Sequence, residues 1–267
     1  MNAEKQNWVE RTWYGDSLVY WVLLPLTCLF SILSSVRRFF YRVGILTTQR
    51  VDAPVVVVGN IAVGGTGKTP ITIWLVKELL RRGQRPAIIS RGYRGNVGPF
   101  PREATEDSDS AVVGDEALML ARQCQCPVIV HPDRVAAARM AIEHGANILV
   151  ADDGLQHYRL DRDVEIAVVD GTRRFGNETM LPAGPLREPI SRLEAADIVL
   201  VQQEMEETAD AWLMRRTTDP QPFNFHLRVA AVVRLDSTET RELSDFAGKT
   251  VHAVAGIGHP ERFFRML

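Results

Sequence analysis

From residue 55 onward, short apolar runs alternate with segments of helical pattern. The runs cover residues 55–58, 87–89, 128–130, 148–151, 165–169 and 198–201. The clearest helical patterns between them cover residues 70–82 and 133–144. Near-continuous apolar strands separated by helices are typical of a parallel sheet that is covered on both faces. The pattern therefore predicts an α/β fold whose ligand site lies at the carboxyl ends of the strands.

The stretch before this alternation is apolar in a different way. Residues 17–36 carry no charge, a length that could span a bilayer. Past Pro25, polar residues recur at steps of three and four, and apolar residues occupy the opposite helical face. A basic flank suited to anionic headgroups follows. It contains Arg37, Arg38, Arg42 and Arg50.

This pattern favours a helix that lies in the cytoplasmic leaflet of a membrane rather than crossing it. Two alternatives stay open, namely a helix buried against the protein core and a single membrane span. A secretory signal is disfavoured, because acidic Glu4, Glu10 and Asp16 occupy the stretch where a basic region should precede the apolar run.

A glycine-rich turn follows the first predicted strand and leads directly into a helix. Glycines let backbone N–H groups curl around phosphates, and the helix N-terminus adds its positive dipole end. Lys68 is predicted to reach the β- and γ-phosphates of ATP, and Thr69 to bind Mg²⁺. A glycine-rich turn without nucleotide is the alternative, and Ala62 stands where the commonest pattern has glycine. The predicted nucleotide-binding residues are Ala62, Val63, Gly64, Gly65, Thr66, Gly67, Lys68 and Thr69. The predicted fold is thus of the P-loop NTPase type.

Two acidic residues, Asp152 and Asp153, follow the apolar run at 148–151. An acidic residue at the end of a neighbouring strand can support the Mg²⁺ of a P-loop. We prefer Asp153 and keep Asp152 as the alternate, although Asp-Asp-Gly can also be a simple turn. Further charged residues fall where loops should leave the same sheet edge and together could serve phosphoryl transfer. They are Arg91, Arg94, Asp115, Glu116, Arg134, His157, Arg187 and Glu188. The alternative for any one of them is a solvated loop charge or a helix cap.

Composition and charge exclude some functions. The chain has 267 residues, with 31 basic and 33 acidic side chains and a net charge of −2. No overall positive field is available to hold a nucleic acid, so no nucleic-acid partner is expected. The three cysteines, Cys28, Cys124 and Cys126, suit a reducing compartment, and the spacing of the last two is too short for a zinc half-site.

The pattern divides the chain into three parts. Residues 1–50 form an N-terminal amphipathic, membrane-associated helical segment, and residues 51–221 form the P-loop domain. Residues 222–267 are the start of a second, smaller lobe, with strand-like runs at 223–235 and 251–255. About 45 residues are few for an independent core, so we expect this lobe to be truncated.

Six motifs in one order make the chain resemble the tetraacyldisaccharide 4′-kinase family over essentially its whole length. They are VVGNIAVGGTGKTP at 57–70, SRGYRG at 90–95, GDE at 114–116, DDGLQHYRL at 152–160, LPAGPLRE at 181–188 and AGIGHP at 255–260. The resemblance implies an enzyme at the cytoplasmic face of the bacterial inner membrane. It would transfer the γ-phosphate of ATP to the 4′-hydroxyl of an acylated glucosamine disaccharide 1-phosphate in lipid A biosynthesis.

The resemblance also implies roles for individual residues. Asp115 would be the catalytic base, assisted by His259, and Lys68 would act on the transferring phosphate. Apart from the resemblance, the charge of Arg91, Arg134 and Arg187 makes them candidates for phosphate contacts, including the 1-phosphate of the substrate, and we expect a monomer. Family members continue past the last residue of this chain with motifs that we do not find here.

Two other functions compete with this interpretation. A membrane-associated switch ATPase with a similar loop would carry a lysine before the two glycines, and that position is Val63 here. A soluble small-molecule kinase would use the apolar N-terminal segment only as core. Neither alternative explains all six motifs.

Overall fold

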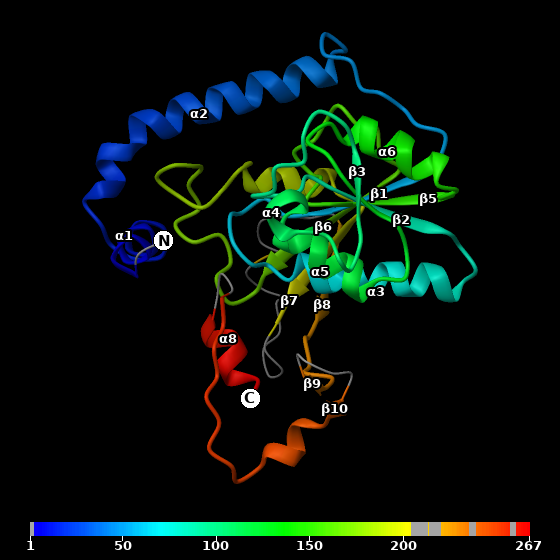
Figure 1. Ribbon diagram of the computed structural model, residues 1–267. Coiled ribbons are helices and arrows are strands. Elements are labelled where there is room, and N and C mark those ends of the chain that lie inside the picture. The colour runs from blue at the N-terminus through cyan, green and yellow to red at the C-terminus, as the bar shows by residue number, and fades with distance from the viewer. Residues whose placement is uncertain (1–2, 204–212, 214–219, 235–238, 257–259) are drawn as a thin grey trace.

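The computed structural model of the chain describes residues 3–203, 213, 220–234, 239–256 and 260–267. Within those residues, eight strands form one sheet in the order β3-β4-β2-β5-β1-β6-β7-β8 (Figure 1). All neighbouring strands are parallel except β3, which runs antiparallel to β4. The strands are β1 (Val55–Gly59), β2 (Pro86–Ser90), β3 (Arg102–Ala104), β4 (Val128–Val130), β5 (Ile148–Asp152), β6 (Val164–Asp170), β7 (Ile198–Gln202) and β8 (Pro222–Phe225). The predicted, mostly parallel α/β fold is confirmed.

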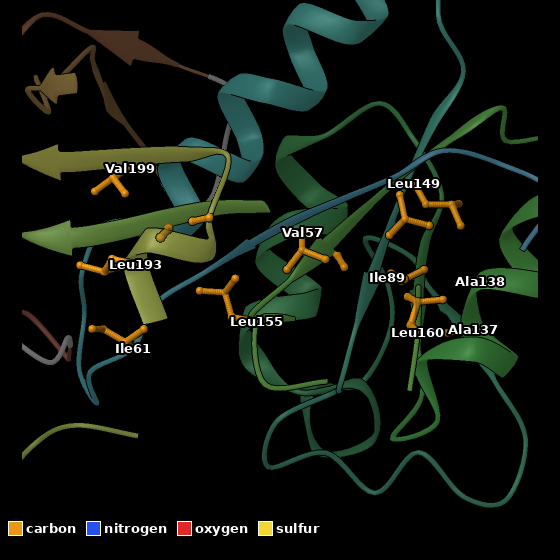
Figure 2. Packing of buried hydrophobic residues seen from close by; sticks show 14 of the residues in the cluster. Val57, Ile61, Ile89, Ala137, Ala138, Leu149, Leu155, Leu160, Leu193 and Val199 are labelled. Atoms are coloured by element: carbon orange, nitrogen blue, oxygen red, sulfur yellow. The ribbon is translucent and has the colours of Figure 1, made fainter. Parts of the chain in front are cut away.

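Helices cover both faces of the sheet, because the side chains of each strand alternate between two buried clusters. In β1, Val55 and Val57 belong to one cluster and Val58 to the other. Ala137 and Ala138 of α6 pack in the first cluster with Val57 (Figure 2). Helices α3 and α5 supply side chains to the second cluster. The helices of this region are α3 (Lys68–Arg81), α4 (Ser110–Val113), α5 (Asp115–Gln123), α6 (Arg134–Glu143) and the 3₁₀ helix η1 (Ile190–Ala195).

The segment predicted to begin a second lobe is divided between two parts of the structure. Strand β8 pairs in parallel with β7, so residues 222–225 extend the main sheet. The strand predicted over 251–255 is wrong, since these residues adopt no regular structure. The remaining elements are β9 (Val232–Val233), β10 (Thr240–Arg241), the 3₁₀ helix η2 (Leu243–Phe246) and α8 (Pro260–Arg265). The boundary between 221 and 222 stays a prediction as a domain limit, but it does not end the sheet.

Two helices precede the sheet, α1 (Ala3–Tyr14) and α2 (Val19–Arg42), and α2 lies as a long rod beside the α/β body (Figure 1). Its polar stripe faces that body. The Thr27 hydroxyl accepts a hydrogen bond from the backbone N–H of Ala183 at 3.0 Å, and the Ser31 side chain reaches Met180. The apolar stripe is exposed, with Leu29 at 54% and Leu33 at 60% of full exposure.

Helix α2 is long and apolar enough to cross a membrane. Only 6% of its most apolar 18-residue window is buried inside the protein. This exposure contradicts the alternative in which the segment is a core helix, because a core helix buries its apolar face.

Candidate active site

The glycine-rich turn connects the end of β1 to the start of α3 and is ordered by its own side chains. Gly67 has φ of 84°, a backbone conformation that favours glycine, and α3 begins at the next residue. The Asn60 amide spans the turn, because its Nδ2 donates to Thr66 Oγ1 at 3.0 Å and its Oδ1 accepts from Lys68 Nζ at 3.0 Å. The positive end of α3 therefore opens onto a preformed loop, as phosphate binding requires.

A second segment runs along this turn and holds it. The backbone N–H of Val63 donates to Pro185, the N–H of Arg187 donates to Ile61, and Ala62 pairs antiparallel with Leu186. This pairing places the Arg187 guanidinium beside Asp153, where Nη1 lies 3.0 and 2.9 Å from the two carboxylate oxygens. The predicted candidates Arg187 and Asp153 are thus brought together with the loop.

The two aspartates at the end of β5 have different surroundings. Asp153 also pairs with Lys68 Nζ at 3.0 Å. Burial opposes ionisation of Asp153, but Lys68 and Arg187 outweigh burial and lower its pKa. Burial raises the pKa of Asp152 to about 6, with Lys68 opposing the shift. Its Oδ1 accepts a hydrogen bond from the Thr72 hydroxyl at 3.2 Å.

Of three further candidates, Arg134 contacts this acidic end, and Arg91 and His157 interact electrostatically with Arg134. Arg134 is buried and donates from Nη2 to the backbone oxygen of Asp152 at 3.1 Å. Burial lowers the pKa of Arg134 to about 10, with Asp152 opposing the shift and Arg91 adding to it. Burial, with Arg134 adding its charge, lowers the pKa of His157 to about 4, so its imidazole is neutral at pH 7. Arg134 thus contacts the end of β5, and its charge acts on both Arg91 and His157.

Asp115 and Glu116 occupy the first turn of α5, and both are exposed. Gly114 before them has φ of 87° and packs against the backbone of residues 92–93, so the helix start is pressed against the loop that follows β2. Glu116 adds to the raised pKa of Asp152. His259, predicted to assist Asp115, lies outside the described residues, so their pairing stays a prediction.

Glu188 was predicted to be one of the charged residues at the sheet edge that serve phosphoryl transfer, but the structure buries its side chain. The side chain is 2% exposed and accepts hydrogen bonds from the Tyr158 hydroxyl and from Gln156 Nε2, the latter at 3.0 Å. Residue 188 follows the segment paired with the phosphate loop, and this pairing carries the carboxylate inward. Glu188 therefore acts on neighbouring side chains rather than on solvent.

Sequence reasoning missed several uncharged residues of the site. Asn60 and Gln156 connect the loop to its supports, and the Gln202 side chain at the end of β7 approaches Gly67 closely. Asn60 and Gln156 lie within the motifs at 57–70 and 152–160, so those motifs were the available signal. They were not named as candidates because the candidates were charged residues, and amide side chains carry no charge.

Comparison with known proteins decides the family. The sequence profile described as "Tetraacyldisaccharide-1-P 4'-kinase" matches residues 19–267. The chain belongs to the tetraacyldisaccharide-1-P 4′-kinase family.

Relatives and a solved structure agree with this assignment. The tetraacyldisaccharide 4′-kinase of Nitrosococcus oceani is 46% identical over 96% of this chain and 72% of that protein. The corresponding protein of Aeromonas salmonicida is also 46% identical, over 97% of this chain and 74% of the relative. The crystal structure of LpxK from Aquifex aeolicus in complex with ATP superposes with a TM-score of 0.79. It is 26% identical, over 93% of this chain and 77% of that one. The resemblance inferred from the six motifs is confirmed.

Proposed function

We propose that this chain is an ATP-dependent lipid kinase that phosphorylates the 4′-hydroxyl of tetraacyldisaccharide 1-phosphate in lipid A biosynthesis. Membership of the 4′-kinase family supports the reaction, and the ATP complex of the Aquifex aeolicus relative supports the donor. The observation that carries the proposal is the phosphate loop at the end of β1, whose Lys68 is held 3.0 Å from Asp153. A loop of this form serves phosphoryl transfer by positioning and by charge stabilisation.

In the proposed reaction the 4′-hydroxyl oxygen bonds to the γ-phosphorus while the bond from that phosphorus to the β–γ bridging oxygen breaks. ADP leaves with the bridging oxygen, and the hydroxyl proton passes to the carboxylate of Asp115 as general base. Lys68 and Arg187, both beside Asp153, offset charge on the transferring group. Asp115 suits the base role because it is exposed and can meet an acceptor that arrives from outside.

Mg²⁺ is the proposed metal cofactor. Thr69, Asp152 and Asp153 offer hydroxyl and carboxylate oxygens, which are the ligands Mg²⁺ prefers. Among the described residues, no three His, Cys, Asp or Glu side chains gather into a closed cage. Mg²⁺ bound there with ATP would neutralise charge on the β- and γ-phosphates.

The acceptor carries acyl chains, and α2 offers a surface that fits them. Its polar stripe bonds to the protein body and its apolar stripe is left exposed, so the apolar face can enter the acyl boundary of a membrane. Arg42 at the end of the helix suits anionic headgroups. We place the enzyme, acting as a monomer, at the cytoplasmic face of the bacterial inner membrane.

The test is transfer of label from γ-labelled ATP to tetraacyldisaccharide 1-phosphate in detergent micelles with Mg²⁺. We expect labelled lipid with the unaltered chain and none with Lys68→Ala or Asp115→Ala. Lys77→Ala is the matched control, because Lys77 is an exposed lysine on the same helix, α3. Wild-type turnover in Lys68→Ala would refute the role of the loop, and absence of label with the unaltered chain would refute the acceptor.

A further inference from the structure

The inward face of α2 contacts the loop that follows β5. Arg38 Nε lies 4.0 Å from Glu188 Oε1, and this buried nitrogen has no hydrogen-bond partner among the residues that the structure describes. One helical turn after Arg38, the Tyr41 ring lies 5.8 Å from the ring of Tyr158. The guanidinium of the neighbouring Arg37 lies 5.9 Å from the Tyr158 ring. The C-terminal half of the exposed apolar helix thus touches the loop that carries Gln156 and His157.

From Arg38, a series of polar contacts leads to the phosphate loop. Glu188 accepts from Gln156 Nε2 at 3.0 Å, and the same Nε2 donates to the backbone oxygen of Asn60 at 3.0 Å. The side chain of Asn60 then contacts Thr66 and Lys68, each at 3.0 Å. One chain of neighbours therefore joins the membrane-facing helix to the lysine that is to contact ATP.

The central carboxylate depends on α2 for its charge balance. Glu188 is 2% exposed, and a buried carboxylate needs nearby cations. Besides Arg38, Arg192 approaches it, with Nε 3.9 Å from Oε2, but Arg192 also pairs with Glu165 at 2.6 Å. Without Arg38, the Oε1 side of Glu188 would lose its nearby cation, and the carboxylate would keep only Arg192, which is shared with Glu165.

We propose that Arg38 is a positioning residue for the kinase reaction, which fixes the phosphate loop for ATP through Glu188, Gln156 and Asn60. Helix α2 then has two roles: its outer face meets the lipid, and its inner face sets the nucleotide site. By thermodynamic linkage, a change in how α2 packs against the protein body changes the affinity for ATP. Bound ATP in turn stabilises the packed position of α2. The inference rests on the proposed function only for the identity of the nucleotide.

The experiment measures the Kd of Mg-ATP for the full chain in detergent micelles by calorimetry. Arg38→Met keeps the length of the side chain but removes its charge, and we expect ATP binding to weaken about fivefold to tenfold. Arg38→Lys restores a cation and should recover most of the affinity. The matched control is Arg81→Met, which breaks an arginine–glutamate pair of 2.8 Å at the surface of α3 and should leave the Kd unchanged.

A double-mutant cycle tests the path itself. If Arg38 acts through Glu188, then Arg38→Met combined with Glu188→Gln should bind ATP no more weakly than Glu188→Gln alone. Multiplied losses would overturn the path, and an unchanged Kd in Arg38→Met with only a lowered melting temperature would show a merely structural role. Failure of the proposed function gives a different result, because the unaltered chain would then bind ATP in the calorimetric experiment but transfer no label to the disaccharide.

Discussion

Gly114 offers a sharp test of how the structure positions the proposed base. Its φ of 87° and ψ of 149° lie in a region used almost only by glycine. A Cβ added there would lie 2.5 Å from the backbone oxygen of Tyr93 and 3.1 Å from the backbone carbon of Gly92. Both are backbone atoms, so no change of rotamer can relieve the contact, and the start of α5 must move.

The magnitude follows from a comparison with Gly145, which shares the φ of +87° but has open space around the added Cβ. Gly145→Ala should cost about 1 kcal/mol from backbone strain alone. Gly114→Ala adds the steric contact and should cost about 3 kcal/mol, near the upper end for a strained position. The difference of about 2 kcal/mol corresponds to about 4–8 °C in melting temperature for a domain of this size.

Thermal unfolding in detergent micelles measures the stability, and the lipid-labelling assay measures kcat. We expect kcat of Gly114→Ala to fall about 10- to 100-fold, because Asp115 moves with the start of α5 and small misplacements of a catalytic group are costly. Gly145→Ala should retain its kcat. Equal melting temperatures for the two variants, or a normal kcat in Gly114→Ala, would refute the argument that this close approach positions Asp115.

Two further predictions concern the membrane helix and the buried histidine. Replacing both Ile32 and Leu33, each 60% exposed, with glutamate should abolish flotation of the protein with anionic vesicles. The control Trp74→Glu changes a 61% exposed site on α3 and should still float. Equal flotation of the unaltered chain, the double variant and the control would contradict a membrane-facing α2. For His157, burial and Arg134 lower the native pKa to about 4 from an ordinary 6.5, so the unfolded chain takes up the proton first as pH falls. Stability should therefore drop between pH 6.5 and 4, by about 1–2 kcal/mol after allowing for partial exposure. His157→Gln should remove this part of the pH dependence of the melting temperature, and an identical profile would refute the assignment.

The local pattern was enough for the parts of the fold whose signals are short-range. Four-residue apolar runs identified β1, β5 and β7, because a strand buried on both faces must be apolar at successive positions. The glycine-rich turn between a strand and a helix located the phosphate loop, because this signal is also contained within a few neighbouring residues. Strand β3 was missed, since Arg-Glu-Ala at the edge of a sheet has no apolar pattern to read.

The candidate site was only partly visible in the sequence. Lys68, Asp152, Asp153 and Arg187 were named, and the structure brings them to one sheet edge. Their relation was not visible, because the contact of Arg187 with Asp153 joins residues 34 positions apart through a backbone pairing that no local pattern encodes. Asn60 and Gln156 gained their importance only from the groups placed beside them.

The sequence by itself determined the buried central strands and the two-sided character of α2, because their apolar positions follow the period of the backbone. It also determined the nucleotide loop, because glycines followed by Lys-Thr at a helix start form a local signal. The tertiary structure decided which side of α2 faces the protein and which is left exposed. It also decided that Glu188 is buried while Asp115 is exposed. The physical reason is that burial and charge balance depend on neighbours from distant parts of the chain, such as Arg38 beside Glu188, and these neighbours meet only when the chain folds.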